Sequence, residues 1–176
     1  MRSTRSHSTR AGFTLIELVT VIVLLGIVGV FVGGPIMSII GDVKSNAAPP
    51  RLAADIRYIQ RIALSSGWRT RIVVDNAGDQ YTLFMKDPDP LDPWKPVRDP
   101  VTQTLGPVQF GVGPFAGVTI DTVDINGTSV LEFDNFGVPY DANGNVLGSL
   151  SRIVLSNNVA VQIHPVSGFV EQVQWP

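Results

Sequence analysis

A single carboxylate, Glu17, stands in an otherwise uncharged and largely apolar sequence that runs from Phe13 to Ile40. A charged group in a bilayer-crossing helix costs about 2.5–3.5 kcal/mol at mid-membrane and less toward the interface, so it is retained where it has a partner. Cleavage after Gly12 would create such a partner, because it would free an α-amino group at Phe13, one helical turn from Glu17. The pair could close within one chain or between neighbouring chains. Only the second arrangement would give Glu17 a role in the register of a polymer.

Other candidate groups for chemistry lack the partners that they would need. His164 has no accompanying acid and nucleophile in any motif, so we predict no catalytic residue and no cofactor. The segment 141–145 places oxygen ligands at alternate positions, as in a calcium loop. However, Val146 stands where such a loop needs glycine and Arg152 where it needs an acid. We interpret this segment as an Asn-Gly turn and predict no metal site.

The composition excludes several classes of protein. The 176 residues are 44% hydrophobic and 16% charged, with a formal net charge of −2 and a mean hydropathy of +0.23. This balance is too apolar for a disordered chain and too weakly charged for a protein that coats nucleic acid. The absence of cysteine excludes disulfide scaffolds, thiol catalysis, zinc ribbons and iron–sulfur sites.

The amino-terminal region has a basic start followed by a long apolar run. Arg2, Arg5 and Arg10 precede the run from Leu18 to Ile40, which carries no formal charge and would form a helix of about 35 Å. A bilayer core is about 30 Å thick, and the positive-inside rule places residue 1 in the cytoplasm. Length and charge alone leave three interpretations open: a signal anchor, a secretory signal cleaved near residues 45–47, and a buried core helix.

This predicted helix contains glycines and a proline that could affect its packing or its geometry. Gly26, Gly29 and Gly33 could let neighbouring helices approach closely, although glycine is also tolerated generally in membrane helices. Pro35 follows Gly33-Gly34 and lacks a backbone donor. We therefore expect the helix to weaken or kink there.

Beyond a short polar segment, Pro49-Pro50 is expected to interrupt the helix and to start a second helical half over residues 51–66, which ends at Gly67. Apolar residues recur there at steps of four, three and four, which predicts one buried face. That face comprises Leu52, Ile56, Ile59 and Ala63. The polar residues Arg51, Asp55, Arg57 and Arg61 are expected to lie largely on the other side.

The periodicity after Gly67 changes to that of about seven short strands, over residues 71–74, 80–85, 118–125, 128–133, 150–155, 159–163 and 169–175. Residues 76–79 and Asn126-Gly127 are hairpin signals. The proline-rich segment 86–100 reads as a surface loop with solvated charges at Asp87, Asp89, Asp92 and Asp99, and residues 134–148 read as a glycine-rich loop. The fold class is α+β: a long amino-terminal membrane-spanning helix packed on a carboxy-terminal antiparallel β domain.

The sequence Gly12-Phe13-Thr14-Leu15-Ile16-Glu17-Leu18 resembles the class III signal of type IV pilins and pseudopilins. The resemblance implies that a prepilin peptidase cuts between Gly12 and Phe13 and N-methylates Phe13. It also implies that Glu17 neutralises the terminal amine of an adjacent subunit. The expected organisation is a leader at 1–12, a transmembrane and filament-core helix at 13–42, and a periplasmic pilin-like domain at 43–176.

The later part of the chain is similar to the GspH/FimT-like group, in residues 57–74 and 131–137. This similarity implies a minor pseudopilin, a non-enzymatic structural subunit of the periplasmic pseudopilus of a type II secretion system. The alternative is a type IV pilus minor pilin involved in pilus assembly or DNA uptake. The implied partners are prepilin peptidase, other major and minor pseudopilins or pilins, an inner-membrane assembly platform, and membrane lipid before extraction. The implied location is the bacterial inner membrane, in a single pass with the amino terminus cytoplasmic, and then a periplasmic filament.

Nucleic acid is not among the expected partners. Trp68-Arg69-Thr70-Arg71 places an aromatic residue beside cations, a combination that could bind a single strand. However, losing three leader arginines would lower the net charge from −2 to −5, and residues 171–176 contain no cation. We interpret residues 68–71 as the junction between a helix and a strand.

Overall fold

The computed structural model describes residues 13–86 and 93–176, and for residues 30–45 it describes the backbone alone. The predicted leader at 1–12, with Gly12, lies outside the described residues, as do Asp87, Asp89 and Asp92. The chain forms two compact units, one that ends at Ile40 and one that begins at Gly41.

The first unit consists of the amino-terminal part of helix α1 (Leu15–Ser66). Its large apolar side chains from Leu15 to Val28 are exposed in the single chain. Within the described residues, no helix combines the length and the apolar character that a membrane crossing requires.

The predicted break at Pro49-Pro50 is wrong, because α1 is helical from Leu15 to Ser66 without interruption. The two prolines remove two backbone donors from the helical ladder. Ala48, Pro49 and Leu52 are nevertheless buried in the second unit, and this packing holds the helical path. The helix ends as predicted at Gly67, whose φ of +74° suits glycine.

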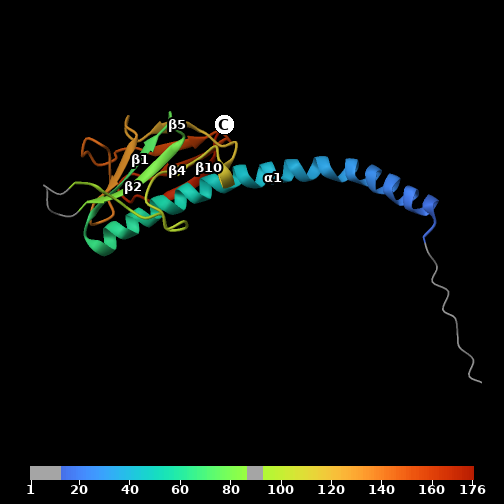
Figure 1. Cartoon of the computed structure of the whole chain (residues 1–176). Helices are drawn as coiled ribbons and strands as arrows, with labels where there is room; N and C mark the ends of the chain where they lie inside the picture. The colour runs from blue at the N-terminus through green and yellow to red at the C-terminus, as the bar shows by residue number, and fades with distance from the viewer. Residues whose placement is uncertain (1–12, 87–92) are drawn as a thin grey trace, which may run out of the picture. The chain divides into compact units, whose positions relative to one another are not determined.

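The second unit contains two antiparallel sheets rather than one set of about seven strands (Figure 1). The first sheet has the order β3-β2-β1-β6-β7, with β4 also paired to β2. Its strands are β1 (Arg69–Asp75), β2 (Gln80–Lys86), β3 (Lys95–Pro96), β4 (Val108–Gln109), β6 (Val130–Phe133) and β7 (Pro139–Tyr140). The second sheet has the order β10-β9-β8-β5. Its strands are β5 (Ile120–Asp124), β8 (Ser151–Leu155), β9 (Val159–Ile163) and β10 (Val170–Gln174).

One predicted hairpin is confirmed, and the other is a corner between the sheets. β1 and β2 pair across residues 76–79, with Asp75 opposite Gln80. At Asn126-Gly127 the turn itself forms, because Ile125 and Thr128 exchange two backbone hydrogen bonds of 3.0 Å. Its flanking strands then separate, since β5 pairs with β8 and β6 pairs with β1. The turn chemistry was readable, but the choice of partner strands is a tertiary property.

The two segments predicted to be loops contain short strands. The predicted loop at 86–100 includes β3, and the predicted loop at 134–148 includes β7. Residues 101–117, for which we predicted no element, include β4 and the single-turn 3-10 helix η1 (Gly113–Phe115). Two-residue strands carry too little sequence signal to be predicted, because their partners in β2 and β6 supply the hydrogen bonds.

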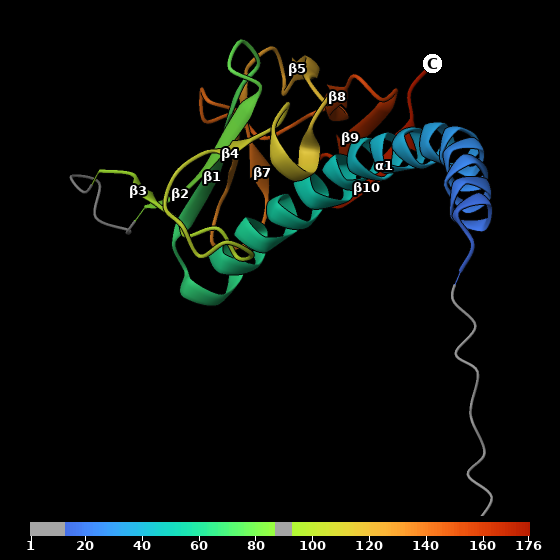
Figure 2. The same cartoon turned by 45° about the vertical axis from the view of Figure 1, so that its right-hand side comes forward.

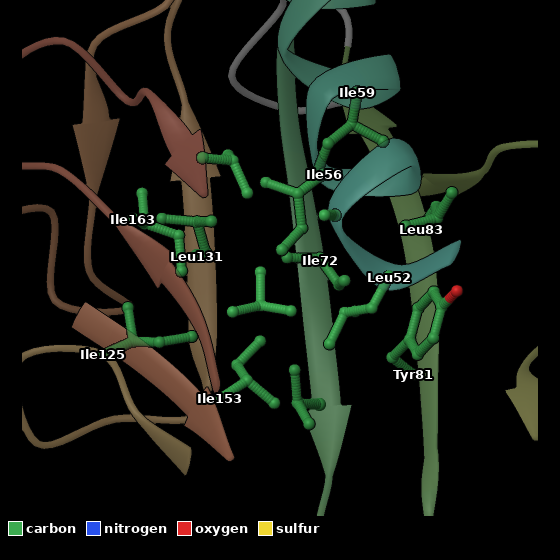
Figure 3. Packing of buried hydrophobic residues seen from close by; sticks show 14 of the residues in the cluster. Leu52, Ile56, Ile59, Ile72, Tyr81, Leu83, Ile125, Leu131, Ile153 and Ile163 are labelled. Carbon is green, nitrogen blue, oxygen red and sulfur yellow. The ribbon is translucent and has the colours of Figure 1, made fainter. Parts of the chain in front are cut away.

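One hydrophobic core joins α1 to both sheets within the second unit. Leu52, Ile56 and Ile59 of the predicted apolar face are fully buried against side chains of both sheets, such as Ile72 and Ile153 (Figure 3). Figure 2 shows β8, β9 and β10 as a group distinct from β1 and β2. The α+β class, a helix packed on antiparallel sheets, is thereby confirmed.

Candidate assembly site

Thr14 and Glu17 cap the start of α1. The backbone N–H of Glu17 donates to the Thr14 hydroxyl at 3.4 Å, and the N–H of Thr14 donates to the Glu17 carboxylate at 3.5 Å. This reciprocal arrangement is a capping box, in which a residue before the first turn and an acid three positions later satisfy each other's free donors. The helix dipole also favours an acid in this first turn.

The capping box gives Glu17 a local role that we did not predict from the sequence. The Thr-x-x-Glu spacing at residues 14–17 is the signal that could have revealed it. Glu17 is exposed, and Phe13, which precedes the cap, is 84% exposed. Within the single chain, the Glu17 side chain therefore remains open to a partner from another molecule.

The glycines predicted to assist helix packing are unobstructed. A Cβ atom built at Gly26 or Gly29 would meet nothing within 4 Å in the single chain. For Gly33 and Pro35 the structure describes only the backbone, which is helical. The roles of all four residues in helix packing or kinking remain predictions.

A buried polar network, which we did not predict, joins α1 to the first sheet and to the segment after β3. Arg51 donates from Nε to Asp55 at 2.9 Å and from Nη2 to Asp99 at 2.6 Å. The Tyr81 hydroxyl donates to Asp55 at 2.6 Å. Asp99 also accepts hydrogen bonds from the backbone N–H groups of residues 101 and 102. The prediction of a solvated Asp99 is therefore wrong, as is that of an outward-facing Asp55.

The network shifts the pKa values of its two carboxyl groups in opposite directions. Burial raises the pKa of Asp55, and the hydrogen bonds from Tyr81 and Arg51 only partly oppose this effect. Burial alone would also raise the pKa of Asp99, but hydrogen bonds from Arg51 and from two backbone N–H groups outweigh it, so that this pKa is lowered. Burial of Tyr81 beside the Asp55 carboxylate raises the pKa of the phenol well above its usual range.

The basic residues after the helix are engaged by the protein itself. Arg69 lies 2.9 Å from the Glu132 carboxylate. The guanidinium of Arg71 lies over the Trp94 ring at 4.2 Å and over the Phe84 ring at 5.3 Å. Residues 68–71 form the helix-to-strand junction that we expected. Their two arginines contact side chains within the second unit.

The other candidate residues also have structural partners. Both oxygens of Asp141 accept hydrogen bonds within the chain, from the backbone of residues 143 and 145 and from the Asn126 and Asn145 amides. Segment 141–145 is thus a turn closed on its own aspartate. His164 contacts Glu171 at 2.6 Å. Among the described residues, no group of three histidine, cysteine or acidic side chains could hold a metal ion.

Comparisons with known proteins agree with the resemblance at the amino terminus. The family described as "Prokaryotic N-terminal methylation motif" matches residues 7–33, which include Gly12, Phe13 and Glu17. The fold is similar to that of the minor pseudopilin EpsH from the type 2 secretion system of Vibrio cholerae. The TM-score is 0.51 at 9% identity, over 74% of this chain and 97% of that chain. A comparison with curated proteins gave no match.

The motif implies a membrane-anchored prepilin of the bacterial envelope that a prepilin peptidase processes and that assembles with other pilins. The second unit supplies the matching architecture of a helix on antiparallel sheets. The chain therefore carries the N-terminal methylation motif at the start of a helix that packs on antiparallel sheets in a pilin-like fold.

Proposed function

We propose that this protein is a minor pseudopilin, a structural subunit without enzymatic activity in the periplasmic pseudopilus of a type II secretion system. The observation that carries the proposal is the position of Glu17, exposed in the first turn of an apolar helix within the matched methylation motif. The GspH-like fold supports the choice of a minor pseudopilin over other pilin-like subunits.

In the proposed mechanism, the chain enters the inner membrane with its amino terminus in the cytoplasm. Prepilin peptidase removes residues 1–12 and methylates Phe13. Extraction then brings the exposed apolar side chains of α1 into a bundle with other subunits, where they are removed from water or lipid. Glu17 pairs with the terminal amine of an adjacent subunit, because an unpaired charge in such a bundle would be costly.

The capping box makes a sharper test of Glu17 possible. Glu17→Gln keeps an acceptor for the Thr14 N–H but removes the charge, whereas Glu17→Ala removes both. Thr14→Ala is the matched control, because it weakens the cap and leaves the charge in place. The measurements are leader cleavage, followed by gel mobility, and the fraction of the mature protein that sediments with filaments released by opening the outer membrane.

If Glu17 acts by charge pairing, both Glu17 variants are cleaved but incorporate poorly, whereas Thr14→Ala incorporates normally. If Glu17 acts only as a cap, Glu17→Gln incorporates like the wild type and Thr14→Ala does not. The second pattern would reject the pairing role.

A further inference from the structure

Four large apolar side chains of the second unit are more than half exposed near the carboxy-terminal end of α1. We call them the turn patch: Leu64, Phe136, Val166 and Phe169, with exposed fractions of 53%, 77%, 69% and 57%. They come from the helix and from two turns that follow β6 and β9. Exposed apolar clusters of this kind mark contact surfaces in soluble domains.

Gln60 fixes both turns to the helix. Its side-chain amide donates to the carbonyl of Gly137 at 3.0 Å and to that of Ser167 at 3.1 Å. A Cβ atom at Gly137 would lie 3.1 Å from Leu64, so the helix side chain rests on the turn that carries Phe136. The patch is therefore a fixed arrangement rather than four unrelated loop residues.

Two hollows on the surface of α1 connect the patch to exposed cations. One hollow is lined by Tyr58, Arg61 and Leu64, among others, and the second by Arg57, Arg61 and Phe169, among others. Arg61 belongs to both hollows and is exposed. The charged side chains among the residues that line these two hollows are those of Arg57 and Arg61.

The backbone at Val166 is strained without any gain in burial. Its φ is +66°, and among the described residues it is the only β-branched one with a positive φ. A bulky residue rarely adopts this conformation, and residues that the surrounding structure holds in strained conformations cluster at functional sites. Because the Val166 side chain is 69% exposed, packing within the chain does not explain why a valine stands there.

We propose that the turn patch is the docking site for a neighbouring pilin-like subunit, which contacts it through a surface with apolar side chains around a carboxylate. The inference rests on the proposed function, because it names a contact within that filament. The charges are complementary: the hollows present Arg57 and Arg61, whereas the chain without its leader arginines falls from a net charge of −2 to −5. A neighbour of similar composition would therefore carry more carboxylates than cations, and a carboxylate on its surface would pair with these arginines.

The test places the photoreactive residue p-benzoylphenylalanine at Phe136, Val166 or Phe169 of the full chain, in cells that assemble the filament. The same residue at Asp121, which is exposed on β5 of the second sheet, is the surface control. Adducts are identified by mass spectrometry. We expect the three patch positions to capture a pilin-like subunit, through a peptide that contains Asp or Glu, with a yield at least about fivefold above that at Asp121.

Charge reversal supplies the second arm. Arg61→Glu should lower the adduct yield at Phe136 at least about fivefold, whereas Arg61→Lys should preserve it. Adducts with lipid, equal yields at Asp121, no adducts at the patch, or indifference to Arg61→Glu would overturn the proposal.

A label at Ile22 separates this inference from the proposed function, because Ile22 lies on the apolar part of α1 that filament assembly would use. If Ile22 captures pilin-like subunits and the patch positions do not, the docking inference fails and the proposed function stands. If neither Ile22 nor the patch captures a pilin-like subunit, the proposed function fails as well.

Discussion

Arg51 of α1 and Asp99 of the segment after β3 form an ion pair of 2.6 Å, although 48 residues separate them in the sequence. Arg51 also binds Asp55, which in turn accepts a hydrogen bond from the Tyr81 hydroxyl. This network fastens the segment around Asp99 to the helix and to the first sheet.

Asp99→Asn should destabilise the second unit by about 2 kcal/mol, because it removes a charge-assisted hydrogen bond from a largely buried pair. Urea unfolding of the full chain in detergent, followed by circular dichroism, measures the change. Asp121→Asn, at an exposed site, is the control and should stay within about 0.5 kcal/mol of the wild type. Equal stability of the two variants would contradict a stabilising role for the Arg51–Asp99 pair.

The effect of Asp99 should disappear in acid. Its folded pKa lies below the ordinary value of 3.8, so the carboxylate contributes stability that is present above pH 3.8 and lost as the pH falls through the folded value. The contribution of Asp55 to stability depends on pH in the opposite direction, because burial raises the pKa of this carboxyl group. Its protonated form is favoured in the folded protein, so this contribution is lost as the pH rises. The difference in unfolding free energy between the wild type and Asp99→Asn reports on Asp99 together with its electrostatic effect on Asp55. We expect this difference to be complete at neutral pH and to shrink below pH 3.8, and a constant difference would argue against this assignment.

Val166→Asn should stabilise the fold by about 1 kcal/mol, since asparagine tolerates a positive φ better than valine does. Val101→Asn is the matched control, because Val101 is equally exposed, at 70%, but is not among the residues with positive φ. Thermal unfolding of both variants measures the difference. A Val166→Asn variant no more stable than the wild type would show that little strain is stored at this turn.

Gly168→Ala should destabilise the fold by about 2 kcal/mol or more, and by more than Gly144→Ala. Both glycines have positive φ values, which alone costs alanine about 1–2 kcal/mol. A Cβ atom at Gly168 would also approach Gln60 to 2.6 Å and Phe133 to 2.8 Å, whereas one at Gly144 would meet nothing within 4 Å. Similar unfolding midpoints for the two variants would contradict the close contact between this turn and α1.

The parts of the fold that were predictable depend on local patterns. The apolar face of α1 from Leu52 to Ala63, the helix end at Gly67 and the strand from Val159 to Ile163 all follow from periodicity and turn chemistry. The capping box at Thr14 was equally local, and its spacing could have been read.

The parts that escaped prediction depend on partners that are distant in the sequence. Whether Asp99 is solvated depends on Arg51, and whether Asp55 faces water depends on Tyr81. The Asn126-Gly127 turn was readable, but the separation of its flanks into two sheets depends on pairing with β1 and β8. No window of local sequence contains that information.

Mass spectrometry of the intact protein isolated from cells tests the central claim most directly. We predict that the chain begins at Phe13 and carries one methyl group on its terminal nitrogen, and that Gly12→Ser leaves it beginning at Met1. A wild-type chain that still begins at Met1, or that is cleaved after the apolar run near residues 45–47, would contradict the account. In either case, no terminal amine would be available at Phe13 to pair with Glu17.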